Sequence, residues 1–345
     1  MRTDQQAGRG AVTGVPEAAV PAAGDGSVAA VTVRDLVKVY RRPGGGSLRA
    51  VDGVSFEVAQ GEVFGLLGPN GAGKTTTLEI IEGIRKPTAG QVRVLGADPA
   101  RDPGHVKRVI GVQLQAASYF SLLTIEEILQ LFGSFYPRRR PPAELLDLVG
   151  LRDKRKSYVR QLSGGQQRRF SVAAALVNDP QVIFLDEPTT GLDPQVRRSL
   201  WELITRLGRD GGKTIILTTH YLEEAELLAG RAAIIDHGQI QVLDTPRRLI
   251  ARLDGAGRIQ FTARGAIEED ELRRLPAVLD VAARDDGGAR ETIGSYQLRV
   301  ADPRAAVSAL LEWARRRDVD LRGLEVLPGT LEDIFLQLTG QQLRD

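Results

Sequence analysis

The 345-residue sequence contains no cysteine, one methionine and only three histidines. The absence of cysteine excludes disulfide frameworks, zinc-thiolate sites and thiol catalysis, and it fits a reducing compartment. No stretch approaches the roughly 18 to 20 consecutive apolar residues that a membrane-spanning helix needs. The opening residues, MRTDQQAGRGAVTG, have neither the basic nor the apolar region of a secretory signal. We therefore expect a cytoplasmic protein that could sit on a membrane through a partner.

An excess of charge of one sign is also missing. The chain has 46 basic and 44 acidic residues, which leaves a net charge of +2. It therefore lacks the strong positive field that drives non-specific binding to nucleic acid, and we expect no nucleic-acid partner. The hydrophobic content of 42% supplies ample material for a core, and the length favours two folded domains.

Sequence patterns divide the chain into three parts. Residues 1–29 are rich in Ala, Gly, Val and Pro without a sustained period, which predicts a disordered N-terminal tail. Residues 30–250 alternate strand-like and helical stretches, with a helical insert between 124 and 178 inside an α/β sheet. Residues 256–345 show the order β-α-β-β-α-β of a small ferredoxin-like α+β unit. They close with TLEDIFLQLTG at 330–340, which predicts a capped amphipathic helix.

The stretch GPNGAGKTT, residues 68–76, fits the motif G-x-x-x-x-G-K-[ST] and lies between an apolar strand and a helical pattern. Its glycines let the backbone turn amides toward a phosphate at a helix N-terminus. Lys74 can reach the β and γ oxygens, and the Thr75 hydroxyl can ligate Mg²⁺. The predicted ATP-binding residues of this loop are Gly68, Pro69, Asn70, Gly71, Ala72, Gly73, Lys74, Thr75 and Thr76.

Two carboxylates end another apolar strand, VIFLDEP at 182–188. A parallel sheet presents such strand ends at its ligand crevice. Asp186 can hold Mg²⁺, and Glu187 can orient or deprotonate the attacking water. Alone, this stretch is also compatible with a solvated acidic turn before Pro188. The phosphate loop is what favours the catalytic interpretation.

His220 ends a further apolar strand, TIILTTH, and Gln115 follows the strand-like GVQL. A lone histidine at a strand end is more often a structural residue, and an isolated glutamine carries no signal. The presence of the other motifs favours a functional role for this histidine. Gln115 becomes a candidate to bond the metal or the attacking water.

The stretches GPNGAGKTT, LSGGQQRR at 162–169, VIFLDEPTTGLDP and TTH, in this order, resemble the ATP-binding subunits of ABC transporters over roughly residues 30–250. The resemblance implies a P-loop NTPase core of ABC type with an antiparallel β subdomain and a helical subdomain, here followed by the small C-terminal α+β domain. EPTTGLDP, TTHYLEEAE and the closing LEDIFLQLTG look most like the daunorubicin-resistance type of multidrug exporter ATPase. Its members work with a separately encoded integral membrane permease.

The resemblance also implies roles for single residues. Tyr40 matches the aromatic that stacks on adenine, and Asp193 of GLDP matches the loop that joins two ATPase subunits. Gln115 matches the glutamine that senses the γ-phosphate and faces the permease, and His220 the switch histidine at the γ-phosphate. Glu187 looks like the catalytic base. The expected catalytic residues are Glu187, His220 and Gln115, and the expected Mg²⁺ ligands are Thr75, Gln115 and Asp186.

LSGGQ is the signature of this family, and it implies a second copy of the chain. Ser163, Gly164 and Gly165 at a helix N-terminus offer a hydroxyl, backbone amides and a favourable dipole end to a γ-phosphate. Together with Gln166 they are expected to contact ATP held by the opposite subunit. Two ATP molecules would then lie between two head-to-tail copies, at the cytoplasmic face of the membrane.

Other interpretations stay open. A soluble ABC-type ATPase acting on DNA or ribosomes is disfavoured, because only about 46 residues separate Gln115 from the signature, too few for a long coiled-coil insert. An importer subunit is disfavoured by LEDIFLQLTG. The part beyond residue 255 could be a regulatory or binding module.

Two aromatic side chains carry a double interpretation from sequence, and three further positions depart from the family pattern or carry no clear role. Tyr119 and Phe120 either receive a permease helix or belong to the core. Arg168 and Arg169 follow the signature and are consistent with a solvated helix face. Gly230 stands where relatives usually carry Asp before an Arg, which puts a contact at a helix end in doubt.

Overall fold

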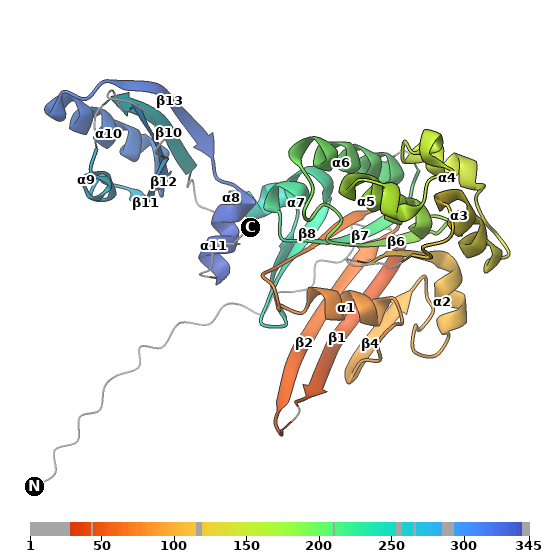
Figure 1. The fold of residues 1–345 in the computed structure, drawn as a ribbon. Coiled ribbons are helices and arrows are strands. Elements are labelled where there is room, and N and C mark those ends of the chain that lie inside the picture. Colours follow the sequence, from red (N-terminus) through yellow and green to blue (C-terminus); the bar gives the residue numbers. More distant parts are fainter. Residues whose placement is uncertain are drawn as a thin grey trace, which may run out of the picture.

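The computed structural model describes residues 28–42, 44–114, 119–209, 211–252, 257–264, 267–284 and 293–339. Residues 1–27 of the predicted tail and Gln115 lie outside these ranges. Two bodies are visible in Figure 1, a larger one formed by residues 28–252 and a smaller C-terminal sheet unit formed by residues 257–328. Within the described ranges, no helix has both the length and the apolar character to cross a bilayer.

The larger body is built on a six-stranded sheet in the order β5-β6-β7-β3-β8-β9. Its pairings are parallel except for the last, between β8 and β9. Strands β6 and β7 are buried along their whole length, as is typical of parallel strands covered on both faces. The six strands are β3 (Val63–Leu67), β5 (Ile110–Gln113), β6 (Val182–Asp186), β7 (Thr214–Thr219), β8 (Arg231–Asp236) and β9 (Gln239–Asp244).

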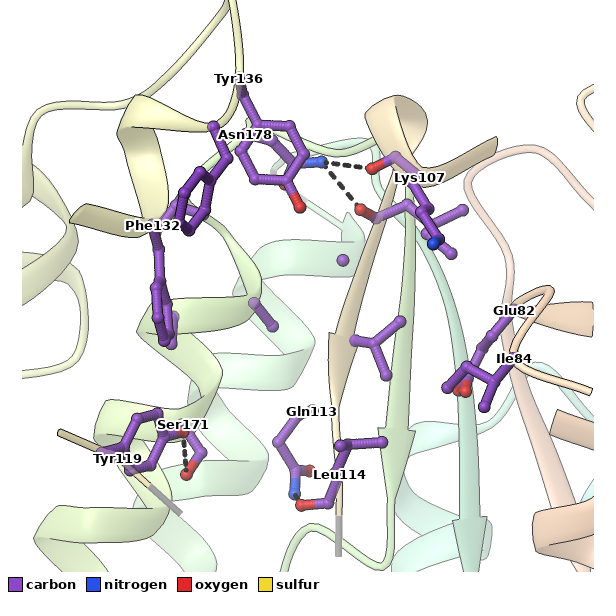
Figure 2. A pocket seen from close by; sticks show the side chains of 17 residues that line it. Glu82, Ile84, Lys107, Gln113, Leu114, Tyr119, Phe132, Tyr136, Ser171 and Asn178 are labelled. Atoms are coloured by element: carbon purple, nitrogen blue, oxygen red, sulfur yellow. Dashed lines mark hydrogen bonds between the residues drawn. The ribbon is translucent and has the colours of Figure 1, made fainter. Parts of the chain in front are cut away.

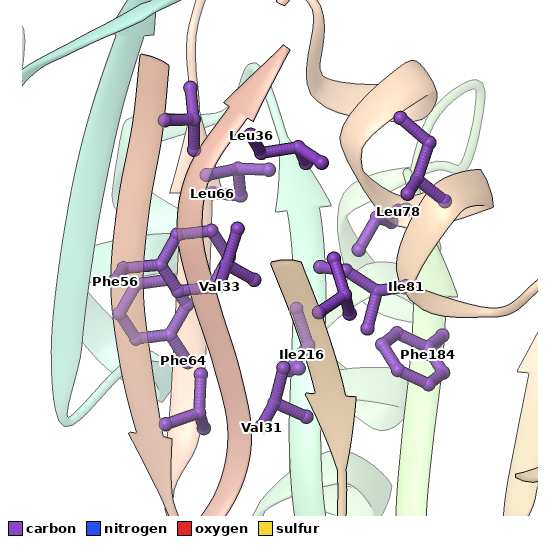
Figure 3. Close-up of a cluster of buried hydrophobic side chains, with 14 of the residues drawn as sticks. Val31, Val33, Leu36, Phe56, Phe64, Leu66, Leu78, Ile81, Phe184 and Ile216 are labelled. Atoms are coloured by element: carbon purple, nitrogen blue, oxygen red, sulfur yellow. The ribbon is translucent and has the colours of Figure 1, made fainter. Parts of the chain in front are cut away.

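A second sheet, with the antiparallel order β2-β1-β4, packs against the first through a shared apolar core. Figure 3 shows this core between the two sheets and the helix α1 (Lys74–Ile81). Phe56 and Phe64 stack across the junction with ring centroids 5.1 Å apart. The predicted turn at GGG is confirmed, since Gly45 donates its N–H to the Arg42 carbonyl. The strands are β1 (Ala29–Arg41), β2 (Ser47–Ala59) and β4 (Ala89–Val94).

The predicted helical insert is confirmed. Helix α3 starts at a capping box in which the Thr124 side chain and the Glu127 side chain each bond the other's backbone N–H. Helices α3, α4 and α5 pack together over the parallel sheet in one apolar cluster. The remaining helices of this body are α2 (Pro103–Val109), α3 (Ile125–Ser134), α4 (Pro142–Leu148), α5 (Gly164–Ala175), α6 (Pro194–Arg209), α7 (Leu222–Leu228) and α8 (Pro246–Ala251), with 3-10 turns at Arg152–Lys154 and Val159–Gln161.

The C-terminal sheet unit has four antiparallel strands in the order β11-β12-β10-β13, the ferredoxin-like arrangement predicted from the element order. Its core is separate from those of the larger body and is built around Phe261, Leu298 and Leu310. The elements are β10 (Gly257–Arg264), α9 (Glu269–Arg273), β11 (Val278–Arg284), β12 (Ile293–Val300), α10 (Pro303–Arg317) and β13 (Leu321–Pro328).

The last helix, α11 (Leu331–Thr339), returns to the larger body. Leu331, Ile334 and Phe335 are buried in one cluster with side chains of β3, β8, β9, α7 and α8. The Leu331 N–H donates to Glu226 Oε1 at 2.6 Å, which satisfies one of the free donors at the helix start. The predicted amphipathic helix therefore exists, but its apolar face covers the six-stranded sheet and not the core of the small one.

Candidate active site

The phosphate loop joins β3 to α1 in the strand-loop-helix context that the motif requires. At Gly68 an added Cβ would lie 2.2 Å from the Ile235 carbonyl oxygen, and at Gly73 it would lie 2.3 Å from that of Ala50. Gly73 also has φ near +103°. Both glycines are thus required by the fold itself, and the loop they permit presents its backbone at the N-terminus of α1.

Lys74 is turned toward its own loop. Its Nζ donates to the carbonyls of Gly68 at 2.7 Å and Pro69 at 3.1 Å, and it lies 4.0 Å from Glu187 Oε1. The side chain is only 5% exposed, and burial lowers its pKa while Glu187 and Asp186 act in the opposite direction. An incoming phosphate would offer this ammonium stronger acceptors than two neutral carbonyls.

Thr75 and Asp186 meet as the sequence predicted, although they are 111 residues apart. Thr75 Oγ1 lies 3.5 and 3.4 Å from the two carboxylate oxygens of Asp186. Asp186 also accepts a 2.5 Å hydrogen bond from the Thr218 hydroxyl. Burial raises the pKa of Asp186, an effect that the Thr218 bond opposes. One carboxylate, one hydroxyl and substrate phosphates are the kind of oxygen set that Mg²⁺ uses, so these residues fit that ion.

Glu187 lies one residue beyond the end of β6 with φ near +47°, an uncommon backbone conformation for a residue other than glycine. Its N–H is fixed by the carbonyl and hydroxyl of Thr218, at 3.2 and 3.0 Å. Its Oε1 lies 3.4 Å from His220 Nδ1. His220 is the main influence that holds the pKa of Glu187 below its usual range. The carboxylate is therefore ionised at neutral pH and able to accept a proton.

The signature Ser163 lies at the N-terminus of α5, as predicted, and the structure shows that it caps this helix. Its Oγ accepts the N–H of Gln166 at 3.3 Å, and Gln166 Oε1 accepts the Ser163 N–H at 3.0 Å. Gly165 is needed where α5 meets α6, since an added Cβ would lie 2.5 Å from Val196. Gly164 is exposed and has no neighbour that a Cβ would meet. No hydrogen bond or ion pair of the described residues joins Ser163 to Lys74.

Two further predicted residues, Asp193 and Tyr40, have local contacts of their own. Asp193 Oδ1 accepts the N–H groups of Gln195 and Val196 at 3.1 and 3.0 Å, so it caps α6. Tyr40, at the end of β1, is half-buried with Lys38 and Arg85 over its ring at 5.2 and 5.8 Å. Gln115 lies outside the described residues, and its predicted roles remain predictions.

The structure shows the surroundings of the two aromatic side chains that had two interpretations. Tyr119 is half-buried at the edge of the core, where it packs against Phe132 and Phe170 and donates to the Ser171 hydroxyl at 3.0 Å. It also lines an open groove beside β5 (Figure 2), so both interpretations of Tyr119 stand. Phe120 is 55% exposed.

The predicted solvated face at Arg168 and Arg169 is wrong. Both side chains are partly buried, and Arg169 donates to the Val149 carbonyl at 3.1 Å. Beside Gly230, Arg231 pairs with Glu62 at 2.7 Å, which anchors the start of β8.

Sequence reasoning missed Glu224, which is completely buried on α7. Its Oε1 accepts the Thr189 hydroxyl at 3.0 Å and the Trp201 indole N–H at 3.1 Å. Thr189 is two residues beyond Glu187, and α7 begins two residues beyond His220. Glu224 thus links the segment that follows Glu187 to the segment that follows His220. In LEEAE it looks like one of three solvated acids, and only the buried partners from distant elements distinguish it.

We predict that Glu224→Ala lowers the free energy of unfolding by about 2 to 4 kcal/mol, because two buried donors lose their acceptor. Glu224→Gln keeps an acceptor oxygen and should lose clearly less. Denaturant unfolding of both variants measures this, with exposed Glu223→Ala as the matched control. Wild-type stability of Glu224→Ala would show that these bonds contribute nothing.

Comparison with known proteins agrees with this geometry. The family described as ABC transporter matches residues 51–190. The chain is 39% identical to the Nod factor export ATP-binding protein I of Ralstonia nicotianae over 336 residues, which cover 94% of this chain and 98% of that protein. The chain belongs to the ABC transporter ATP-binding family.

Other relatives of this ABC subunit carry resistance names. It is 38% identical to the daunorubicin/doxorubicin resistance ATP-binding protein DrrA of Streptomyces peucetius, over 92% of this chain and 94% of the relative. It is 36% identical to a linearmycin resistance ATP-binding protein of Bacillus subtilis, over 87% and 96%. A solved dimeric ATP-binding cassette in a post-hydrolysis state with ADP and phosphate matches with a TM-score of 0.58 and 28% identity, over 62% of this chain and 98% of that one. The predicted ABC fold and the predicted ATPase activity are confirmed.

Proposed function

We propose that this ABC ATPase powers the export of a drug, an antibiotic or another hydrophobic compound through a separately encoded membrane permease. The observation that carries the proposal is similarity to exporter and resistance ATPases over 87 to 94% of the chain, beyond the nucleotide-binding cassette alone. The subunit itself would then be a peripheral protein at the cytoplasmic face of the membrane. The pocket for the transported compound would belong to the permease.

In the proposed working state, two copies lie head to tail with two ATP molecules between them. Gly68 to Thr76 of one copy hold the phosphates, and Tyr40 stacks on the adenine. Ser163, Gly164, Gly165 and Gln166 of the other copy complete the site, and Asp193 lies at the junction. Support comes from the exposure of Gly164 and from the dimeric cassette to which the fold is similar.

Hydrolysis is assigned to the pair formed by Glu187 and His220. In this proposal ATP draws Lys74 away from the Gly68 and Pro69 carbonyls, so the ammonium balances phosphate charge. Glu187, ionised beside His220, accepts the proton of the attacking water, and His220 contacts the γ-phosphate. Mg²⁺, when held by Thr75 and Asp186, and by Gln115 if it joins them, supplies further neutralisation of the phosphates. Loss of the γ-phosphate removes the link between the two copies and lets them separate.

A transport assay tests this proposal. The subunit is co-expressed with the membrane protein encoded beside it, and accumulation of doxorubicin and other hydrophobic compounds is measured in intact cells. We expect lower accumulation than in cells with the permease and Lys74→Ala subunit. Accumulation above that control would indicate an importer. Equal accumulation of every compound, with ATPase activity unaffected by the permease, would contradict the transporter assignment.

A further inference from the structure

The C-terminal sheet unit carries two arginines side by side on its polar face. Helices α9 and α10 cover the other face, where alternate residues such as Ile259 and Leu298 are buried. Because successive side chains of a strand point to opposite faces, Arg258 of β10 and Arg299 of β12 belong to the polar face. These strands are neighbours in the sheet (Figure 1), and the two arginines stand directly opposite each other in their ladder. Like charges in such a pair destabilise a sheet unless an anion balances them.

The carboxylates near this arginine pair do not balance it. Arg258 Nε lies 3.9 Å from Asp333 Oδ2, which is too long for a hydrogen bond. That oxygen already accepts the Thr330 N–H at 2.8 Å and the Thr330 hydroxyl at 3.2 Å. Asp280 stands opposite Arg299 on β11, yet among the residues that the structure describes no carboxylate lies within 4.0 Å of the Arg299 guanidinium.

Each arginine of the pair also has a donor atom without an acceptor. The Nε atoms of Arg258 and Arg299 are buried, and within the described ranges neither donates a hydrogen bond. Most buried polar atoms in native proteins are paired, and an unpaired donor on a cation is especially costly. The Arg258 side chain is 21% exposed, so the pair is open to a small ligand from solvent. One anion with several oxygen atoms can bond both arginines, because each guanidinium presents a fork of donors.

We propose that Arg258 and Arg299 form a binding site for the phosphate or carboxylate group of a small molecule. The site belongs to a different folded unit from the phosphate loop, and it goes beyond the proposed function without depending on it. Gln260 and Gln297 bond each other at 3.4 Å on the same face and add amide donors beside the arginine pair. The bound anion competes with Asp333 for Arg258. The sheet unit thereby gains the binding role that the sequence left open.

Calorimetric titration of the full-length subunit tests the site, with inorganic phosphate and citrate as the probes and Mg·ADP present to fill the phosphate loop. Arg299→Gln removes one cation and should weaken binding of the preferred probe by about 10-fold or more. The matched control is Arg264→Gln, on the same strand and face as Arg258 but exposed and opposite Ile293. It should bind within about twofold of the wild type.

Two further measurements separate a binding role from a structural one. Without a probe, Arg299→Gln should melt no lower than the wild type, because it removes one of two facing like charges. Asp333→Asn removes the competing charge and keeps an acceptor oxygen for the Thr330 N–H. It should therefore strengthen probe binding by about threefold.

The preferred probe identifies the ligand group, with phosphate indicating a phosphate ester and citrate indicating a carboxylate. The proposal is overturned if Arg299→Gln binds both probes as the wild type does, or if it loses no more affinity than Arg264→Gln. A lower melting temperature of probe-free Arg299→Gln would also contradict it, since the arginine pair would then be balanced within the protein. None of these results bears on ATP hydrolysis or on transport, which have their own tests.

Discussion

Glu187→Gln should bind ATP like the wild type and hydrolyse it about 10² to 10⁴ times more slowly, the usual scale for the loss of a positioned base. Glutamine has nearly the same shape, so the uncommon backbone at this position and the Thr190 hydroxyl contact at 3.2 Å can persist. What it lacks is the ability to take a proton from water. The charge of Lys74 is still balanced in this variant, by Asp186 and by the phosphates of bound ATP, so ATP binding should persist.

The measurement pairs a binding assay with a turnover assay. A fluorescent ATP analogue gives Kd, and phosphate release under saturating ATP gives kcat. Glu223→Gln, an exposed acid on α7, serves as the matched control and should behave like the wild type in both. A Glu187→Gln enzyme that turns over at the wild-type rate would remove Glu187 from the catalytic role.

The phosphate loop could be predicted from sequence because its requirements are local. Only glycine fits the close approach of the Ile235 carbonyl at position 68 and the positive φ at position 73. The glycines of the motif therefore predict the geometry of the loop. The same holds for the cap at Ser163, where the bonding partner Gln166 is three residues away. The ferredoxin-like order followed from periodicity for the same reason, since each strand and helix carried its own pattern.

The buried acids could not be predicted in this way. Glu82 and Glu224 occupy helical stretches in which acids usually face solvent. Their burial depends on packing between distant segments: Glu224 Oε1 accepts hydrogen bonds from donors that lie 23 and 35 residues away in the sequence. The surface against which α11 packs could not be predicted from the sequence either. An apolar stripe such as Leu331, Ile334 and Phe335 fits any apolar surface of suitable shape.

The shared site gives the second large prediction. Lys74→Ala destroys the phosphate-loop half of a site, and Ser163→Arg destroys the signature half by replacing the hydroxyl with a bulky cation at an exposed position. In a mixed pair, the phosphate loop of the Ser163→Arg copy faces the intact signature of the Lys74→Ala copy. One complete site is therefore regained, although neither variant alone can form any. Loss of the serine cap costs about 1 kcal/mol, so the fold should persist.

The ATPase rate of an equal mixture of these two variants, compared with each alone, tests the head-to-tail account most directly. If the copies pair at random and sites act independently, half of the pairs are mixed and carry one good site of two, which predicts up to about a quarter of the wild-type rate. Each variant alone should be near background. A mixture no more active than its components, with mixed pairs demonstrated by cross-linking, would contradict the claim that Ser163 acts on the ATP bound by the other copy.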